Sequence, residues 1–73
     1  MLRKGMHRMM KAHEIKAALT LKNVSQADIA RKLGVKRMTV NGVIAGRGKS
    51  ERIQQEVAKV IGKPVEEVWP QSA

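Results

Sequence analysis

The sequence predicts an all-α fold, a compact bundle of about five short helices that contains a helix-turn-helix. Three observations support this prediction. Apolar residues recur at spacings of three and four, residues that favour helix starts and stops separate the apolar runs, and no segment alternates as a strand would. The 73 residues suffice for one small domain.

The N-terminal residues 1–11 show no sustained periodicity and are predicted to form a basic, flexible arm. The first helix is predicted over residues 12–21, where apolar side chains share one face. We therefore expect the folded domain to span residues 12–70 and residues 71–73 to form a short tail.

The second helix, predicted over residues 26–33, has strong signals at both ends. Ser25 is a suitable N-cap, and Asp28 stands where a capping box requires an acidic residue. Gly34 should end this helix, because glycine adopts the left-handed backbone conformation without the steric cost that a β-carbon brings.

Three further helices are predicted after Gly34. The third covers residues 37–45, although Lys36 is a poor N-cap for it. Ser50 caps a fourth helix, in which apolar residues recur at i, i+4, i+7 and i+8 from Ile53. Pro64 suits the first position of a fifth, very short helix.

Three residues stand in the frame that a helix-turn-helix requires. Ala30 is small enough for the second helix to cross closely, Gly34 makes the sharp turn, and Val40 locks the two helices together. The expected core of the motif consists of Ile29, Ala30, Leu33, Gly34, Val35, Val40 and Val43.

The charge of the chain favours an anionic partner. The formal net charge is +9. Residues 1–22 and residues 23–49 each contain six basic residues and one acidic residue, whereas residues 50–73 contain three basic and four acidic residues. Such an asymmetric field attracts nucleic acid, with an anionic membrane surface as the weaker candidate.

The exposed side of the predicted third helix suits the major groove of DNA. Arg37 can pair with guanine, Asn41 with adenine, and Met38 can contact a thymine methyl group. The predicted base contacts are Lys36, Arg37, Met38 and Asn41. The predicted phosphate contacts are Gln26, Thr39, Arg47 and Lys49.

Two segments carry a resemblance to known proteins. The stretch "SQADIARKLGVKRMTVNGVI" is similar to the DNA-binding core of phage repressor and Cro-like proteins. The continuation "GKSERIQQEVAKVIGKPVEEVWP" resembles the Ner family of small phage transcription regulators. The likeness covers residues 13–70 and implies a five-helix domain that binds operator DNA, acts as a repressor and works in a bacterial or phage-infected cell, on the nucleoid.

Catalytic and metal-binding functions find no support in the sequence. The segment "GRGKS" lacks the glycine spacing and the preceding strand of a phosphate-binding loop. His7 and His13 have no cysteine or paired carboxylate to join them in a metal site. We therefore predict no enzyme activity, cofactor, metal or small-molecule substrate. No apolar run approaches the roughly 20 residues that span a bilayer.

The expected partner is double-stranded DNA. A homodimer is one open possibility, and the lack of a long coiled-coil seam favours a dimer that forms only on DNA. Two alternative functions are a protein-interaction module, such as an antitoxin-like adaptor with secondary DNA contact, and a basic protein that binds nucleic acid without sequence preference.

Overall fold

The computed structural model describes residues 10–70, so residues 1–9 and 71–73 lie outside the described range. The described residues form helices and no strand, which confirms the all-α prediction. The helices are α1 (Ala12–Leu21), α2 (Gln26–Leu33), α3 (Arg37–Ile44), α4 (Glu51–Ile61) and α5 (Val65–Val68).

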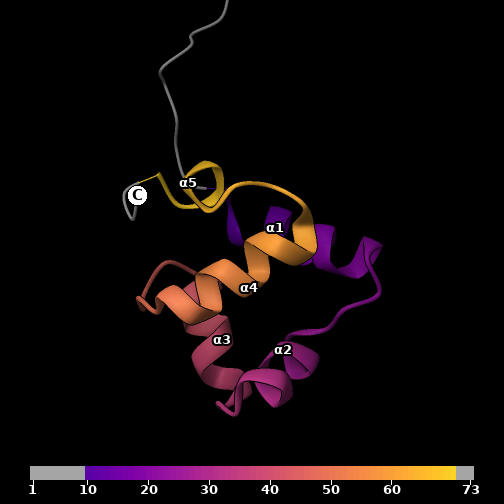
Figure 1. Cartoon of the computed structure of the whole chain (residues 1–73), viewed down its shortest axis with the longest axis vertical. Coiled ribbons are helices and arrows are strands. Elements are labelled where there is room, and N and C mark those ends of the chain that lie inside the picture. Colours follow the sequence, from indigo (N-terminus) through magenta and orange to yellow (C-terminus); the bar gives the residue numbers. More distant parts are fainter. Residues whose placement is uncertain (1–9, 71–73) are drawn as a thin grey trace, which may run out of the picture.

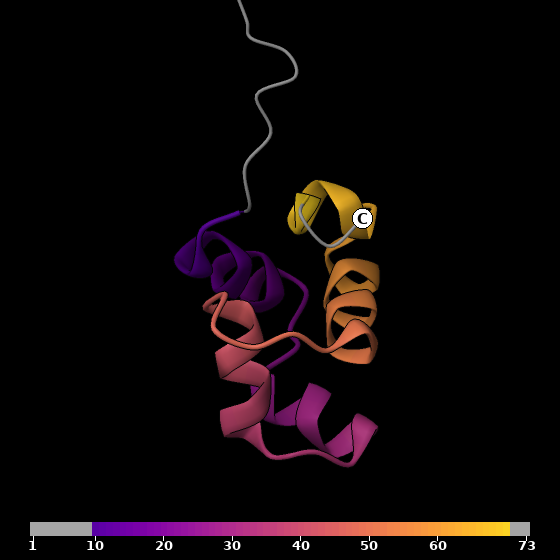
Figure 2. The same cartoon turned by 90° about the vertical axis from the view of Figure 1, so that its left-hand side faces the viewer.

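Helix α4 is the centre of the bundle, because it packs against α1, α2, α3 and α5. Helices α2 and α3 lie at one end of the molecule and α5 lies at the other (Figure 1). In the view turned by 90°, the chain crosses from the end of α3 to the start of α4 below α1 (Figure 2). The α2–α3 pair is thus held from one side by the rest of the bundle.

One continuous hydrophobic core joins the described helices. Its buried residues are Ile15, Leu19, Ile29, Ala30, Val40, Val43, Ile44, Ile53, Val57, Ala58, Val68 and Trp69. Burying one valine, leucine or isoleucine side chain contributes about 1.5–3 kcal/mol to folding stability relative to leaving it exposed. None of the helices within residues 10–70 combines the length and apolar character needed to cross a membrane.

The last two residues of the predicted arm pack on the domain. The Met10 N–H donates to the carbonyl of Val68 at 3.2 Å, and the Met10 side chain packs against the core. Lys11 is the N-cap of α1, and its N–H donates to Glu14 Oε1 at 2.8 Å. The folded domain therefore includes residues 10 and 11, whereas the rest of the predicted arm lies outside the described residues.

Two helix boundaries differ from prediction by one residue. Ala45 is the C-cap of α3 rather than its last residue, since its ψ of −6° already departs from the helix and Gly46 follows with a φ of +86°. Pro64 is the N-cap of α5 rather than its first residue, because its ψ is 147° and thus extended.

The buried face of α4 is also broader than its apolar residues predict. Gln54 and Ala58 are buried, while Val60 and Ile61 are only half-buried. A helix with neighbours on several sides buries more than one apolar stripe, and only the packing of the bundle determines which residues those are.

Candidate nucleic-acid interface

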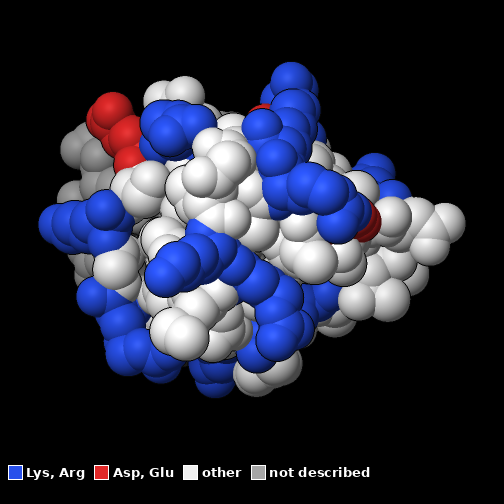
Figure 3. All heavy atoms as spheres, turned by 90° about the horizontal axis from the view of Figure 1, so that it is seen from below, with Lys and Arg blue, Asp and Glu red and all other residues white. Residues whose placement is uncertain are grey.

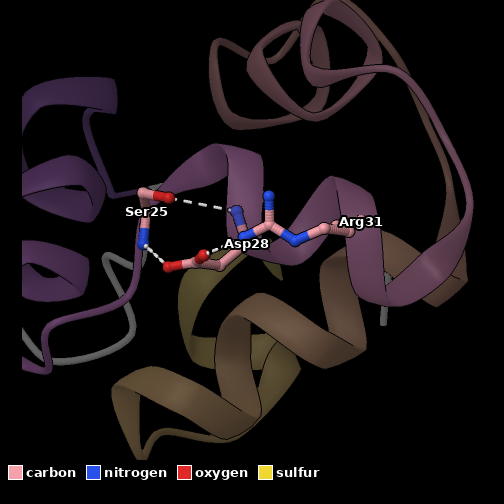
Figure 4. Close-up of polar contacts among 3 residues, drawn as sticks. All are labelled: Ser25, Asp28 and Arg31. Carbon is pink, nitrogen blue, oxygen red and sulfur yellow. Dashed lines mark hydrogen bonds and ion pairs between the residues drawn. The ribbon is translucent and has the colours of Figure 1, made fainter.

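The start of α2 is fixed by a reciprocal pair of hydrogen bonds (Figure 4). The Asp28 N–H donates to Ser25 Oγ at 3.0 Å, and the Ser25 N–H donates to Asp28 Oδ2 at 2.9 Å. Arg31 forms an ion pair with the same carboxylate. The hydrogen bonds from the backbone and side chain of Ser25, aided by Arg31, lower the pKa of Asp28 below its ordinary value. The predicted capping box is confirmed.

The turn after α2 is held from within the motif and from α4. Gly34 has a φ of +72°, as the sequence predicts, and the Val35 N–H donates to the Ala30 carbonyl at 2.9 Å. Arg52 of α4 donates from Nη2 to the Leu33 carbonyl at 2.9 Å. This contact satisfies one of the carbonyls that a helix end leaves free.

An ion pair also ties α2 to α4. Lys32 Nζ lies 2.9 Å from Glu56 Oε2, and the Glu56 side chain is only 13% exposed. Together with the Arg52 contact, this pair fixes the orientation of the turn relative to the bundle.

The predicted core of the helix-turn-helix lies between α2, α3 and the rest of the bundle. Ile29, Ala30, Val40 and Val43 are buried, and Leu33 and Val35 are half-buried against them. Because Val40, Val43 and Ile44 take the inner side of α3, its other side must face solvent.

The outer side of α3 carries the residues predicted to contact DNA bases. Lys36, Arg37, Met38 and Thr39 are exposed, and the exposed fraction of Met38 is 78%. Asn41 is half-buried. Lys36 is the N-cap of α3 but makes no side-chain capping bond, as expected from its residue type.

Gly42 lies one helical turn after Met38 on this outer side. A β-carbon built on Gly42 would find no heavy atom within 4 Å, so the surface there is open. The absence of a side chain leaves the α3 backbone accessible to a partner between Met38 and the end of the helix.

Two adjoining hollows lie between α1, α2 and α3. The first, of about 260 Å³, is lined by Lys16, Leu19, Thr20, Val24, Ser25, Gln26, Ala27 and Arg37. The second, of about 340 Å³, is lined by Lys16, Gln26, Arg37, Met38 and Asn41. Four of the predicted contact residues, Gln26, Arg37, Met38 and Asn41, are therefore brought together.

Sequence reasoning missed Lys16, which lines both hollows. In the sequence it is one more exposed lysine on a helix outside the motif. Only the packing of α1 against α3 brings it beside Arg37.

Other predicted contacts lie around this group rather than in it. Thr39 and Lys36 are exposed but do not line the two hollows. Arg47 and Lys49 are exposed on the loop after α3, and the Arg47 N–H donates to the Gly42 carbonyl at 2.9 Å, which ties the loop to the end of α3. The exposed charges of Arg47 and Lys49 suit contacts with DNA phosphates better than contacts with base edges.

The end of the molecule formed by α2 and α3 is rich in positive charge. Figure 3 shows this end, where Lys and Arg side chains spread across the surface and Asp and Glu cover much less of it. A surface with this excess of positive charge concentrates a polyanion before any specific contact forms.

No group of three His, Cys, Asp or Glu side chains comes together in residues 10–70. His13 is exposed on α1, and His7 lies outside the described residues.

Comparison with known proteins connects this geometry to a family. A family model described as winged helix-turn-helix DNA-binding matches residues 9–72. No curated protein and no solved structure matches the chain. Since residues 10–70 contain no strand, the described part of the chain displays the helix-turn-helix and the helices that support it.

Proposed function

Because the chain belongs to the winged helix-turn-helix DNA-binding family, we propose that it is a sequence-specific regulator of transcription. It reads operator DNA by placing the outer side of α3 in the major groove. The domain binds rather than catalyses, and every residue named in this proposal acts through contact with DNA.

The observation that carries the proposal is the division of α3 into two sides. Val40, Val43 and Ile44 are buried, so the helix cannot turn its outer side away from solvent. That side presents a guanidinium from Arg37 and an amide from Asn41, and both groups suit bidentate pairing with purine edges. The highly exposed Met38 provides an apolar contact between them.

Phosphate contacts around α3 fix the orientation of the helix in the groove. We assign this role to Gln26, Thr39, Arg47 and Lys49. Lys36, at the start of α3, can reach either a base edge or a phosphate. Gln26 is the first residue of α2, and first-turn N–H groups favour a phosphate oxygen.

The resemblance to the Ner family extends the proposal to the biological setting. It supports a repressor in a phage or prophage context, bound to operator DNA on the nucleoid. A symmetric dimer on a pseudo-palindromic operator would place its half-sites about 10–10.5 base pairs apart, and we propose that this dimer forms on DNA.

Selection from a random pool of duplexes tests the proposal. We expect one preferred site, bound about 10³-fold or more tightly than random DNA, with two protein chains on each palindromic duplex. Equal affinity for all duplexes, together with a steep loss of binding in salt, would instead identify a basic protein without sequence preference. Weak binding to every duplex and a co-purifying protein would favour the adaptor.

A further inference from the structure

The two hollows beside α3 share a set of residues that the helix-turn-helix alone does not provide. Lys16 from α1, Gln26 from α2 and Arg37 from α3 line both of them. Three separate helices thus contribute polar or cationic side chains to one place on the surface, next to the side of α3 that faces solvent.

Both hollows are positively charged, and no carboxylate offsets that charge. Neither lining contains an Asp or Glu residue. Within residues 10–70, Lys16 and Arg37 form no ion pair, whereas Arg31 and Lys32 are paired with Asp28 and Glu56.

Asp28 is the acidic residue nearest in sequence to Gln26, and its carboxylate is already engaged. It accepts the Ser25 N–H and pairs with Arg31 (Figure 4). Asp28 lines a neighbouring hollow, which shares Thr20, Val24 and Ser25 with the first hollow but does not include Lys16, Gln26 or Arg37.

Backbone donors add to the same hollow. The first N–H groups of a helix have no intrahelical acceptor. In α2, the N–H of Asp28 donates to Ser25 Oγ and that of Ile29 donates to the Ser25 carbonyl. The N–H groups of Gln26 and Ala27, in the first turn of α2, have no acceptor within the helix, and both residues line the first hollow. A helix start favours an anion, so the first turn of α2 adds to the attraction of the cationic side chains for an oxyanion in this hollow.

We propose that α1 is a third DNA-contacting element, in which Lys16, with Gln26 and the flank of Arg37, holds one backbone phosphate of the duplex. This inference rests on the proposed function, because a helix in the major groove brings a sugar-phosphate strand along its side. A water molecule takes about 30 Å³ of liquid volume, so either hollow admits a phosphate group with part of its hydration.

The test compares two lysines of similar exposure and different position. Lys16→Gln removes one charge from the hollow, and Lys59→Gln removes one from an exposed position of α4 that lines neither hollow. Lysine and glutamine have similar helix propensities, so both variants should fold, and thermal unfolding checks this.

Binding to the selected duplex is measured between 50 and 200 mM salt. Each phosphate contact adds about 0.9 to the slope of log affinity against log salt, which is about 3.5-fold over this fourfold range. We expect Lys16→Gln to bind more weakly, to lose one such contact from the slope for each protein chain on the duplex, and to keep the base preference of the parent. Lys59→Gln should keep the parental slope.

A phosphate scan of the duplex provides a second readout. Replacing phosphates one at a time by neutral methylphosphonates should reveal one position in each half-site that weakens the parent more than it weakens Lys16→Gln, because Gln26 and Arg37 still contact that phosphate in the variant. A parental salt slope in Lys16→Gln, or a scan in which both proteins respond alike at every position, overturns the inference while the proposed function stands. A parent without any preferred duplex defeats the proposed function, and the salt slopes of the parent and of Lys16→Gln on a fixed duplex still report on Lys16.

Discussion

Replacing Gly42 by alanine should stabilise the fold and weaken DNA binding, and these opposite effects test the placement of α3. Gly42 lies inside α3, its φ is not positive, and an added β-carbon meets no heavy atom within 4 Å. The protein itself therefore offers no steric resistance to Gly42→Ala.

The gain in stability can be worked out from backbone entropy. Alanine is favoured over glycine in a helix interior by about 0.5–1 kcal/mol. In a domain of this size, 1 kcal/mol shifts the melting temperature by about 4–8 °C, so we expect an increase of about 2–8 °C. In the proposed placement of α3 on DNA, the new methyl group would occupy space next to the groove wall, and crowding of this kind costs about 1–3 kcal/mol.

Gly34→Ala is the matched control, since its β-carbon also meets no heavy atom within 4 Å. The φ of +72° at Gly34 makes the same substitution unfavourable there by about 1–2 kcal/mol. Calorimetry gives both melting temperatures, and titration of the selected duplex gives both affinities. If Gly42→Ala is more stable and binds DNA as tightly as the parent, α3 does not approach the duplex at this position and our placement is wrong.

Three further predictions address the contacts and the start of α2. Arg37→Ala should reduce the binding free energy on the preferred duplex by about 1–3 kcal/mol and relax the preference at one base pair. Lys49→Ala should weaken binding to all duplexes alike and lower the salt slope by about one contact. An equal loss of affinity for all duplexes in Arg37→Ala would refute its role in base reading. Ser25→Ala should cost about 1 kcal/mol of unfolding free energy by denaturant titration, and more than Ser50→Ala, because the Ser50 cap is a single bond of 3.5 Å. Because the pKa of Asp28 is lowered in the folded state, the contribution of its ionised carboxylate to folding stability is complete above the ordinary pKa of 3.8 and is lost as pH falls through the folded-state pKa. The difference in unfolding free energy between the parent and Asp28→Asn should therefore shrink below about pH 4. A difference that does not change with pH contradicts this prediction.

The start and end of α2 could be predicted from the sequence because their causes are local. The bonds between Ser25 and Asp28 join residues three apart, and the positive φ of Gly34 is a property of one residue. Short-range interactions of this kind depend little on the rest of the fold. The boundaries at Ala45 and Pro64 shifted by one residue, because cap positions and terminal helical positions accept similar residue types.

The candidate site was predictable only in part. The exposed side of α3 follows from its apolar spacing, and thus Arg37, Met38 and Asn41 could be named in advance. Lys16 could not, because its position beside Arg37 depends on how α1 packs against α3. The residue pattern within α1 does not predict that Lys16 lies close to Arg37.

The sequence by itself determined where the helices lie, to within one residue at Ala45 and Pro64, together with the Ser25 and Ser50 caps and the turn at Gly34. Each of these features arises from residues within one or two helical turns of one another. The tertiary structure alone decided that Arg52 caps α2 from α4, that Gln54 is buried, and that three helices meet around the hollows beside Arg37. These contacts join residues distant in the chain, and their geometry is set by how the whole core packs rather than by any local preference.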